Sequence, residues 1–270
     1  MTWLRADILG VGLWGPGLEG WAASRPVLAG AVPYEPRASP APPPALLAAT
    51  ERRRTGPVIR LALAAAHEAA SASGLVPSSL RSVFGSSNGD GVVVGGILQA
   101  LATAPAGERV VSPTAFHNSV HNAPAGYWSI ATASSQPATC LGCNDWTWAA
   151  SLLTALAELA ADGGTVLLCC YDHPLPDPLA ALRPTLAPLG VGLVLGAPGA
   201  GTALATIAVR FHPDPPAQTG LLRTAGLRAL AGGNAVGPAL HVLEALARGE
   251  ADAHAVRYLQ GRLDISVQPA

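Results

Sequence analysis

The stretch from residue 138 to residue 170 constrains the fold most. The pattern predicts a strand over 138–143, a helix ending at Asp162 and a second, buried strand over 165–170. Gly163 and Gly164 would end the helix, whose apolar residues repeat at the spacing of one helical face. A strand–helix–strand crossover joins parallel strands of one sheet. The sequence therefore predicts an α/β protein.

The rest of the chain is predicted to form a surface loop and further strands and helices. Prolines are dense between residues 33 and 44, which predicts a surface loop there. Pro124 is expected to break or kink a helix that spans residues 116–130. The other expected strands are 6–11, 80–84, 190–196, 201–211 and 263–267, and the other expected helices are 57–74, 91–101 and 235–248.

Composition narrows the class of protein. Half of the 270 residues are apolar, only 12% are charged, and the net charge is −1. Such a chain suits elements that are buried on both faces and a surface partly covered by another subunit. It offers no electrostatic reason to bind nucleic acid or an acidic membrane. No signal peptide and no uninterrupted apolar run of bilayer length are evident, so we expect a cytoplasmic protein without a membrane span.

Residues 10–15 match the G-x-G-x-x-G pattern of dinucleotide-binding folds directly after an expected strand. In that motif the third glycine lies in an opening helix, whose N-terminus holds the pyrophosphate. Pro16 and Gly17 follow at once and prevent such a helix. We therefore interpret these glycines as a tight loop and expect no cofactor.

Residues 85–89 match G-x-S-x-G between a strand and a helix, the form of a hydrolase nucleophile elbow. Acids and histidines that could complete a triad follow later in the chain. The motif is short and the chain is rich in glycine and serine, so chance matches are frequent. A serine hydrolase or acyltransferase that uses Ser87 is kept as an alternative. The candidate partners are Asp145, Asp172, His173 and His241.

Two other patterns could bind metal, but both are incomplete. Cys140 and Cys143 form a single C-x-x-C, and no second pair stands at the distance that a tetrahedral zinc site needs. Both lie on the expected strand, rather than at a helix start that would stabilise a thiolate. His117 and His121 share a helical face at i, i+4, without a third ligand nearby. We expect no metal site and interpret these histidines as packing or interface residues.

The region from Ser112 to Asp172 resembles the nucleophile region of β-ketoacyl synthases, the condensing enzymes of the thiolase fold. The resemblance rests on motifs in a fixed order and spacing, with further matches at residues 8–17, 83–89 and 194–201. It covers about residues 3–210. The matching motifs are Ser112-Pro113, Gly126-Tyr-Trp-Ser-Ile130, Gln136-Pro137-Ala138, the strand to Cys143, and the helix and strand that follow.

The resemblance implies one thiolase-like half, a mixed five-stranded sheet with helices, over residues 1–210. Residues 211–270 would form a helix and strand extension packed on it, and the second half of a condensing enzyme would be lacking. A single half leaves one sheet face uncovered. We expect residues 211–270 to cover part of that face and another subunit the remainder.

The same resemblance places Asp145 where the family has its nucleophilic cysteine. A carboxylate at a helix N-terminus is favourable by about 0.3–1 kcal/mol, but it cannot form the thioester. The family's His-Gly-Thr motif and its Gly-rich Asn/His motif do not occur in this sequence. The resemblance thus implies no catalytic residue in this chain. Cys143 stands two residues early, on the strand.

Residues 116–122 and 125–130 look most similar to truncated synthase-like proteins of aryl polyene and related polyketide-type fatty acid systems. The resemblance implies a chain-length-factor-like subunit that forms a heterodimer with a full-length β-ketoacyl synthase. An acyl chain on acyl carrier protein would reach it through that synthase. A second alternative is an autonomous acyl-binding or decarboxylase-like protein in which Asp145 takes part in chemistry.

Carried over by position, two sets of residues would have roles in such a complex. The expected dimer interface is Ala138, Thr139, Cys140, Leu141, Gly142, Cys143, His117 and His121. The expected far end of the acyl tunnel is Ser87, Asn88, Thr114, Ala115 and Phe116.

Overall fold

The structure is a computed structural model that describes residues 2–105, 107–199, 202–215 and 220–270. Over these residues nine strands form one sheet in the order β4-β3-β5-β6-β1-β7-β9-β8, with the short β2 paired to β1. The strands are β1 (Leu4–Gly15), β2 (Leu18–Glu19), β3 (Arg81–Gly85), β4 (Ala138–Leu141), β5 (Thr165–Asp172), β6 (Leu189–Gly196), β7 (Ala205–His212), β8 (Asp252–Tyr258) and β9 (Gly261–Pro269).

The sheet is mixed. β4, β3 and β5 are parallel, as the predicted crossover requires, and every pair from β5 through β6, β1, β7 and β9 to β8 is antiparallel. The five strands β4-β3-β5-β6-β1 match the mixed five-stranded sheet expected from the sequence, and β7, β9 and β8 continue it.

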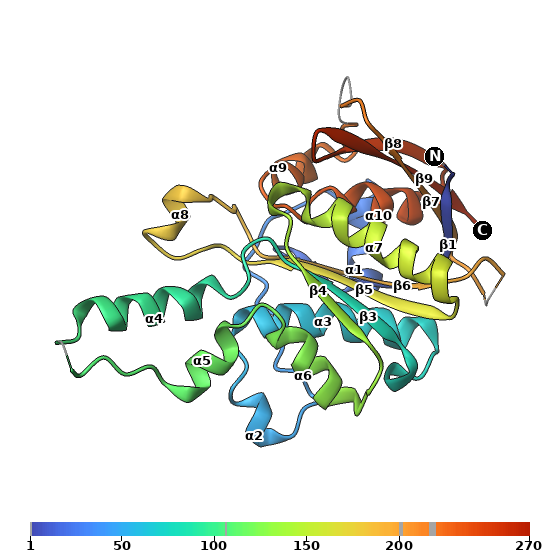
Figure 1. Ribbon diagram of the computed structural model, residues 1–270. Coiled ribbons are helices and arrows are strands. Elements are labelled where there is room, and N and C mark those ends of the chain that lie inside the picture. Colours follow the sequence, from blue (N-terminus) through green and yellow to red (C-terminus); the bar gives the residue numbers. More distant parts are fainter. Residues whose placement is uncertain (1, 106, 200–201, 216–219) are drawn as a thin grey trace.

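Helices cover both faces of the sheet (Figure 1). On one face α3 (Pro57–Ser73) packs across β1, β6 and β5, with α6 (Ala123–Thr132) beside it. On the other face α7 (Thr147–Asp162) lies with α1 (Trp21–Leu28) and α10 (Ala239–Arg248). Two apolar clusters result, one on each face.

The interpretation of residues 10–15 as a tight loop is wrong, because β1 runs on to Gly15. A side chain at Gly12 would meet the backbone of α3, since a Cβ there would lie 2.0 Å from the Ala65 carbonyl oxygen. Gly192 in the neighbouring β6 faces the same oxygen at 2.4 Å. These glycines allow α3 to lie against the sheet backbone, a close approach that only glycine permits.

Two helices replace the single helix expected over 116–130. α5 (Pro113–Ser119) ends before His121, and α6 begins at Ala123 with Pro124 in its first turn. Proline fits there because its missing N–H has no helical partner in a first turn. The expectation that His117 and His121 share a helical face is therefore wrong.

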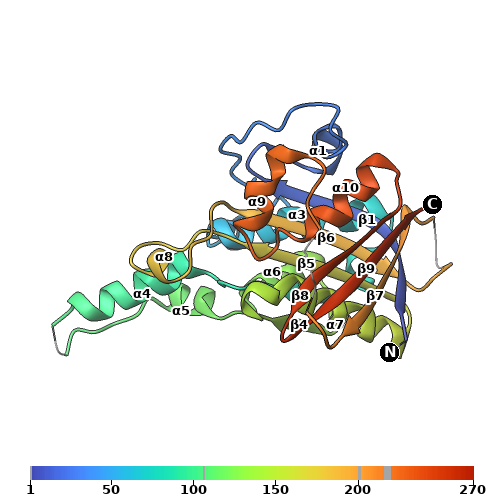
Figure 2. The ribbon, with the colours of Figure 1, turned by 90° about the horizontal axis from the view of Figure 1, so that it is seen from above.

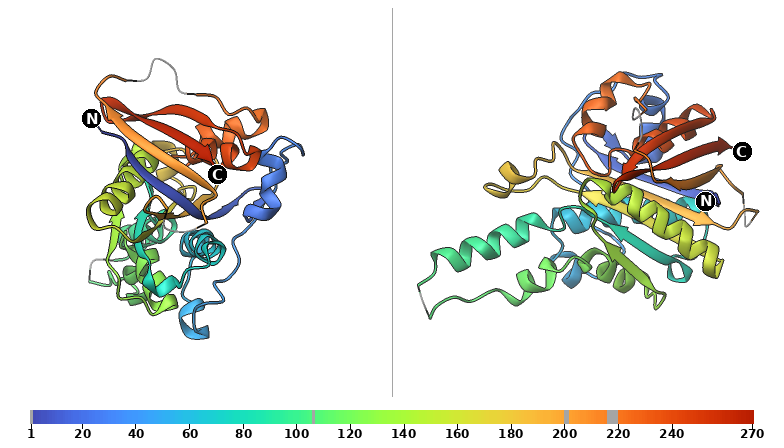
Figure 3. Two further views of the ribbon diagram at one scale, coloured as in Figure 1. Left: turned by 90° about the vertical axis from the view of Figure 1, so that its right-hand side faces the viewer. Right: turned by 45° about the horizontal axis from the view of Figure 1, so that its top comes forward.

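α4 (Gly91–Thr103) and α5 form an arm that projects from the body (Figure 1; Figure 3, right). α4 is apolar along its length but is mostly not buried. Leu98 on α4 is 52% exposed and Phe116 on α5 is 66% exposed. The arm thus presents apolar side chains that the described chain does not cover.

The described part of residues 211–270 extends the sheet by β8 and β9 and covers part of the face that carries α7. α10 packs against α1 and contacts β8 and β9 (Figure 2), and its apolar residues join those of α7 in one cluster. Residue 210 lies within β7, so this strand crosses the predicted boundary between the thiolase-like half and the extension. The division of the chain at residue 210 stays a prediction. The short elements are α2 (Ala49–Arg52), η1 (Pro77–Ser79), η2 (Asn144–Trp146), α8 (Leu179–Leu182), η3 (Ala225–Leu227) and α9 (Arg228–Gly232).

Among the residues that the structure describes, no helix combines the length and the apolar character that a bilayer crossing needs.

Candidate functional site

The loop after β3 is built around a buried carboxylate. Asp172, at the end of β5, accepts hydrogen bonds from the hydroxyls of Ser86 (2.8 Å) and Ser87 (2.6 Å). It also accepts the backbone N–H groups of Ser87 (2.9 Å) and Asn88 (3.0 Å). Burial raises the pKa of Asp172, and these hydrogen bonds oppose the shift. The carboxylate therefore fixes the loop's shape.

This geometry does not support a hydrolase that uses Ser87. A serine nucleophile needs a histidine that accepts its proton, but the Ser87 hydroxyl donates its single proton to the Asp172 carboxylate, at 2.6 Å. The Nε2 atom of the nearby His121 is instead hydrogen-bonded to the Ser86 carbonyl oxygen, at 2.9 Å. Within the described residues no histidine bonds the Ser87 hydroxyl. The G-x-S-x-G match is a loop anchored from β5.

Asp145 lies in η2, the turn that leads from β4 into α7. Its side chain is 83% exposed and accepts a hydrogen bond from the Arg183 guanidinium at 2.8 Å. Neither Asn144 nor Asp145 caps the helix, because α7 has no side-chain cap at its start. Thr147 instead accepts the Cys143 N–H at 3.0 Å and so orders the turn.

Arg183 connects this turn to the serine loop. Its guanidinium donates to the side-chain oxygens of Asn88, at 2.9 Å, and Asn144 as well as to Asp145. The Asn88 amide in turn donates to the Thr185 hydroxyl at 2.9 Å. The structure thus joins two residues predicted for the tunnel, Ser87 and Asn88, to Asp145 in one polar network.

The other predicted tunnel residues lie apart from that network. Thr114, Ala115 and Phe116 are on α5 in the projecting arm, where Thr114 and Phe116 are exposed and Ala115 is half-buried. Their role and that of Ser87 and Asn88 stay predictions.

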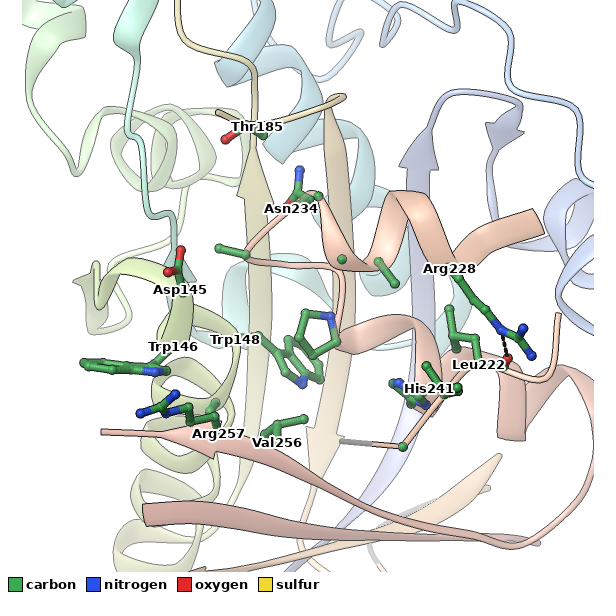
Figure 4. A pocket seen from close by; sticks show the side chains of 18 of the residues that line it. Asp145, Trp146, Trp148, Thr185, Leu222, Arg228, Asn234, His241, Val256 and Arg257 are labelled. Atoms are coloured by element: carbon green, nitrogen blue, oxygen red, sulfur yellow. Dashed lines mark hydrogen bonds between the residues drawn. The ribbon is translucent and has the colours of Figure 1, made fainter. Parts of the chain in front are cut away.

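A cavity of about 600 Å³ opens beside Asp145, between the start of α7, the loop at residues 183–185 and the extension (Figure 4). None of the five predicted tunnel residues lines it. Its lining includes Asp145, Trp146, Trp148, Arg183, Thr185, Leu222, Arg228, Asn234, Pro238, His241, Val256 and Arg257.

Most residues of this cavity were not predicted from sequence. His241 was considered only as a triad partner, yet it lines the cavity and stacks on His254 with ring centroids 4.7 Å apart. Burial, with the His254 charge, lowers the pKa of His241 to about 4, so the ring is neutral at neutral pH. Arg183, Trp148 and Arg257 carried no motif, and the tertiary fold alone brings them together.

β4 forms one edge of the sheet, and half of its backbone groups face outward. The carbonyl oxygens of Pro137 and Leu141 accept from β3 and its loop, at 3.1 Å each. Because alternate residues of a strand direct their bonding groups to the same side, the N–H and C=O groups of Ala138 and Cys140 face away from β3. The expected interface strand therefore presents an open edge, although whether a partner pairs with it stays a prediction.

The remaining predicted interface residues have local partners. His117 packs edge-to-face on Tyr127, with ring centroids 5.8 Å apart. Burial raises the pKa of the Cys140 thiol, so it is not activated as a thiolate. Gly142 and Cys143 lie beyond the end of β4, and the Cys143 sulfur has no histidine within hydrogen-bond distance in the described chain. In that same part of the chain no group of three or more His, Cys, Asp or Glu side chains is arranged to hold a metal ion.

Comparison with solved structures gives the same fold. One chain of the ketosynthase (ApeO) in complex with its chain length factor (ApeC) from Xenorhabdus doucetiae aligns at 20% identity with a TM-score of 0.72, over 97% of this chain and 99% of that one. The ishigamide ketosynthase/chain length factor aligns at 15% identity with a TM-score of 0.70, over 97% of this chain and 98% of that one. A β-ketoacyl synthase from Burkholderia phymatum STM815 aligns at 13% identity with a TM-score of 0.67, over 98% of this chain and 99% of that one.

These likenesses confirm the fold class expected from the sequence, a thiolase-like α/β half with a mixed sheet. None of the curated proteins compared with the chain matches it. The family model of the β-ketoacyl synthase N-terminal domain matches residues 29–247, which is most of the sequence. The chain therefore belongs to the family of the β-ketoacyl synthase N-terminal domain.

Proposed function

We propose that this chain is a chain-length-factor-like partner of a full-length β-ketoacyl synthase and carries no acyl group itself. One observation carries the proposal: the turn into α7 holds Asp145, at the position where the sequence register with condensing enzymes requires a thiol. Condensation needs a nucleophile that forms a covalent acyl intermediate and later releases it. An exposed carboxylate paired with Arg183 is not such a nucleophile.

The similar structures support a partner role. Two of them are described as a ketosynthase with its chain length factor. The narrower assignment to aryl polyene or related polyketide-type fatty acid synthesis rests on the sequence similarity of residues 116–122 and 125–130. In this proposal the synthase receives the acyl chain from acyl carrier protein and supplies the cysteine and the histidines.

The open edge of β4 supports the position of the interface. Strands at a sheet edge pair readily with another chain unless charge or distortion prevents it. Residues 138–143 carry no charge, and the backbone groups of Ala138 and Cys140 face outward along the edge. We assign this strand, together with His117 and His121, to the contact with the synthase.

The arm supplies the second part of the proposal. Its exposed apolar residues, Phe116 and Leu98 among them, would be costly to leave in water and suit burial against a subunit. We propose that Thr114, Ala115 and Phe116, with Ser87 and Asn88 at the base of the arm, close the far end of the synthase's acyl tunnel. The side chain at residue 115 would then limit product length.

Co-expression with a full-length β-ketoacyl synthase tests the proposal. An obligate interface of this type buries about 2,000 Å² or more, so we expect a defined one-to-one complex in gel filtration with light scattering. The chain expressed alone should self-associate or be poorly soluble. A well-behaved monomer that ignores the synthase would contradict the proposal.

A further inference from the structure

The projecting arm is held to the body by a segment that is mostly irregular. Of the described helices and strands, α4 packs most closely on α5, which belongs to the arm itself. A further contact comes from residues 173–185, the segment that follows β5 and contains the short helix α8. We call this segment the strap. Figure 1 and Figure 2 both show α8 on the side of the body from which α4 projects.

The strap contacts α4 at two glycines. A Cβ at Gly91 would lie 2.1 Å from the Cδ2 atom of Leu175, and a Cβ at Gly95 would lie 3.0 Å from the Cγ atom of Pro176. These glycines are four positions apart and so share one face of the helix. At Gly96, the next residue, a Cβ would meet open space. The strap thus lies on one face of α4, where the absence of side chains allows its close approach.

Both ends of the strap are bound to the side chain of Asn88, in the loop that leads into α4. The Asn88 amide donates to the His173 carbonyl oxygen at 3.0 Å and to the Thr185 hydroxyl at 2.9 Å. Its side-chain oxygen accepts a hydrogen bond from the Arg183 Nε at 2.9 Å. A side-chain amide has two N–H donors and one acceptor oxygen, so the strap uses all three groups. The strap is therefore a loop whose two ends meet at the base of the arm.

The strap is also stiff and fixed to the body. Proline holds φ at about −65° and so leaves a segment few other conformations. The strap contains four prolines, at positions 174, 176, 178 and 184. Arg183 donates in addition to Asn144 and Asp145, in the turn that leads into α7. A stiff loop that is bound to the body at its ends and packed on α4 in between restrains the direction of that helix.

We propose that Leu175 and Pro176 are positioning residues, which set the direction of the arm and thereby the chain length that the synthase complex releases. The inference rests on the proposed function, because that function places the end of the acyl tunnel on the arm. Both residues act through α4 and make no contact with the acyl chain. Loosening the strap should therefore broaden the range of product lengths, whereas bulk at Ala115 should shorten the products.

A matched pair of leucine truncations on the strap tests the proposal. Leu175 is half-buried against α4, whereas Leu182 on α8 is 84% exposed. Lost packing favours local opening, so in Leu175→Ala the amides of α4 should exchange hydrogen about tenfold faster, in the full chain and in its complex. The main product of the synthase complex should lose its dominance over longer and shorter chains. Leu182→Ala should change neither quantity, and both variants should still form the complex in light scattering.

A second pair of variants tests the same contact from α4. A leucine side chain at Gly95 would displace Pro176, whereas one at Gly96 would enter open space. Only Gly95→Leu should speed the exchange of α4 and broaden the products. Both variants add the same side chain to the same helix, so the difference in helix propensity between glycine and leucine is matched.

The outcomes separate this inference from the proposed function. Unchanged exchange of α4 in Leu175→Ala and Gly95→Leu would overturn the restraint itself. Faster exchange with an unchanged range of products would overturn its role in chain length. If Ala115→Trp still shortens the products in that case, the proposed tunnel stands without the strap. If Ala115→Trp also leaves the products unchanged, the tunnel is overturned as well.

Discussion

The two edge strands of the sheet, β4 and β8, differ in how readily they can pair with another chain. β4 is short and uncharged and leaves the backbone groups of two residues facing outward. β8, at the opposite edge, carries Asp252, His254 and Arg257, and the Asp252 carboxylate bonds the His254 ring at 2.7 Å. Charged residues on an edge strand discourage pairing with another chain. One edge is thus open to a partner, and the other is closed.

The surroundings of the two edges differ in the same sense. At the β8 edge, Tyr258 packs edge-to-face on Phe211 with 6.0 Å between ring centroids, and Val256 is buried. The arm, which lies between β3 and β4 in the sequence, leaves Leu98 and Phe116 exposed. A protein can thus complete its own core at one edge of a sheet and leave the other edge for assembly.

Matched charges placed on the two edge strands should have the largest and most unequal effects. Ala138 and Ala253 are both exposed alanines on edge strands. We expect Ala138→Lys to weaken the complex with the synthase about 100-fold, or roughly 2.8 kcal/mol, and Ala253→Lys to leave it unchanged. Pull-down and light scattering measure both. Equal effects of the two lysines would contradict the assignment of β4 as the interface.

Bulk on the arm should change the product rather than the assembly. Ala115→Trp fills space at the proposed end of the acyl tunnel, so the synthase complex should release shorter chains, by about two carbons or more. Each CH₂ group that loses its buried site forfeits about 0.8 kcal/mol. Ala253→Trp on β8 is the control. If mass spectrometry finds the same product lengths for both variants, the arm does not form the end of the tunnel.

The extension should lose stability at acid pH because of His241. The pKa of His241 is lowered to about 4, so the unfolded chain binds more protons than the folded chain below the ordinary histidine pKa of 6.5. Stability should therefore fall as the pH drops from about 6.5 to 4, by about 1 kcal/mol after allowance for partial exposure.

Urea unfolding at pH 7.5, 6 and 5 measures this loss. His241→Gln should flatten the pH dependence, whereas His212→Gln on β7 should not. A dependence that survives His241→Gln unchanged would show that other groups cause it.

The smallest effect is expected at Asp145. Its pair with Arg183 is exposed on the aspartate side, and such surface pairs contribute about 0–1 kcal/mol. Asp145→Asn should leave synthase turnover within about twofold and the complex intact. A fall of about tenfold or more would mean that Asp145 takes part in chemistry, as in the decarboxylase-like alternative.

Local sequence patterns were enough for the parallel part of the fold. The crossover over 138–170 was predictable because one helix face is apolar and glycines follow Asp162. The helix after Pro57 was predictable because proline suits its first turn and Gly74 ends it in the left-handed conformation. These signals lie within a few residues of the elements they define.

Long-range contacts decided what could not be predicted. Gly10 and Gly12 looked like a loop because nothing nearby in sequence reveals that α3 crosses them. β8 was not predicted because its charged residues hide the pattern that is typical of a strand. Asp145 and Arg183 are separated by 38 positions with no periodic pattern between them, so their contact, and with it the cavity, depended on the tertiary fold.

Intact-protein mass spectrometry of the complex tests the central claim most directly. The co-purified heterodimer would be incubated with acyl carrier protein bearing an acyl thioester, quenched, and both subunits weighed. We expect the acyl mass on the synthase and none on this chain. A stable acyl adduct on this chain, on Cys143 or any other side chain, would contradict it.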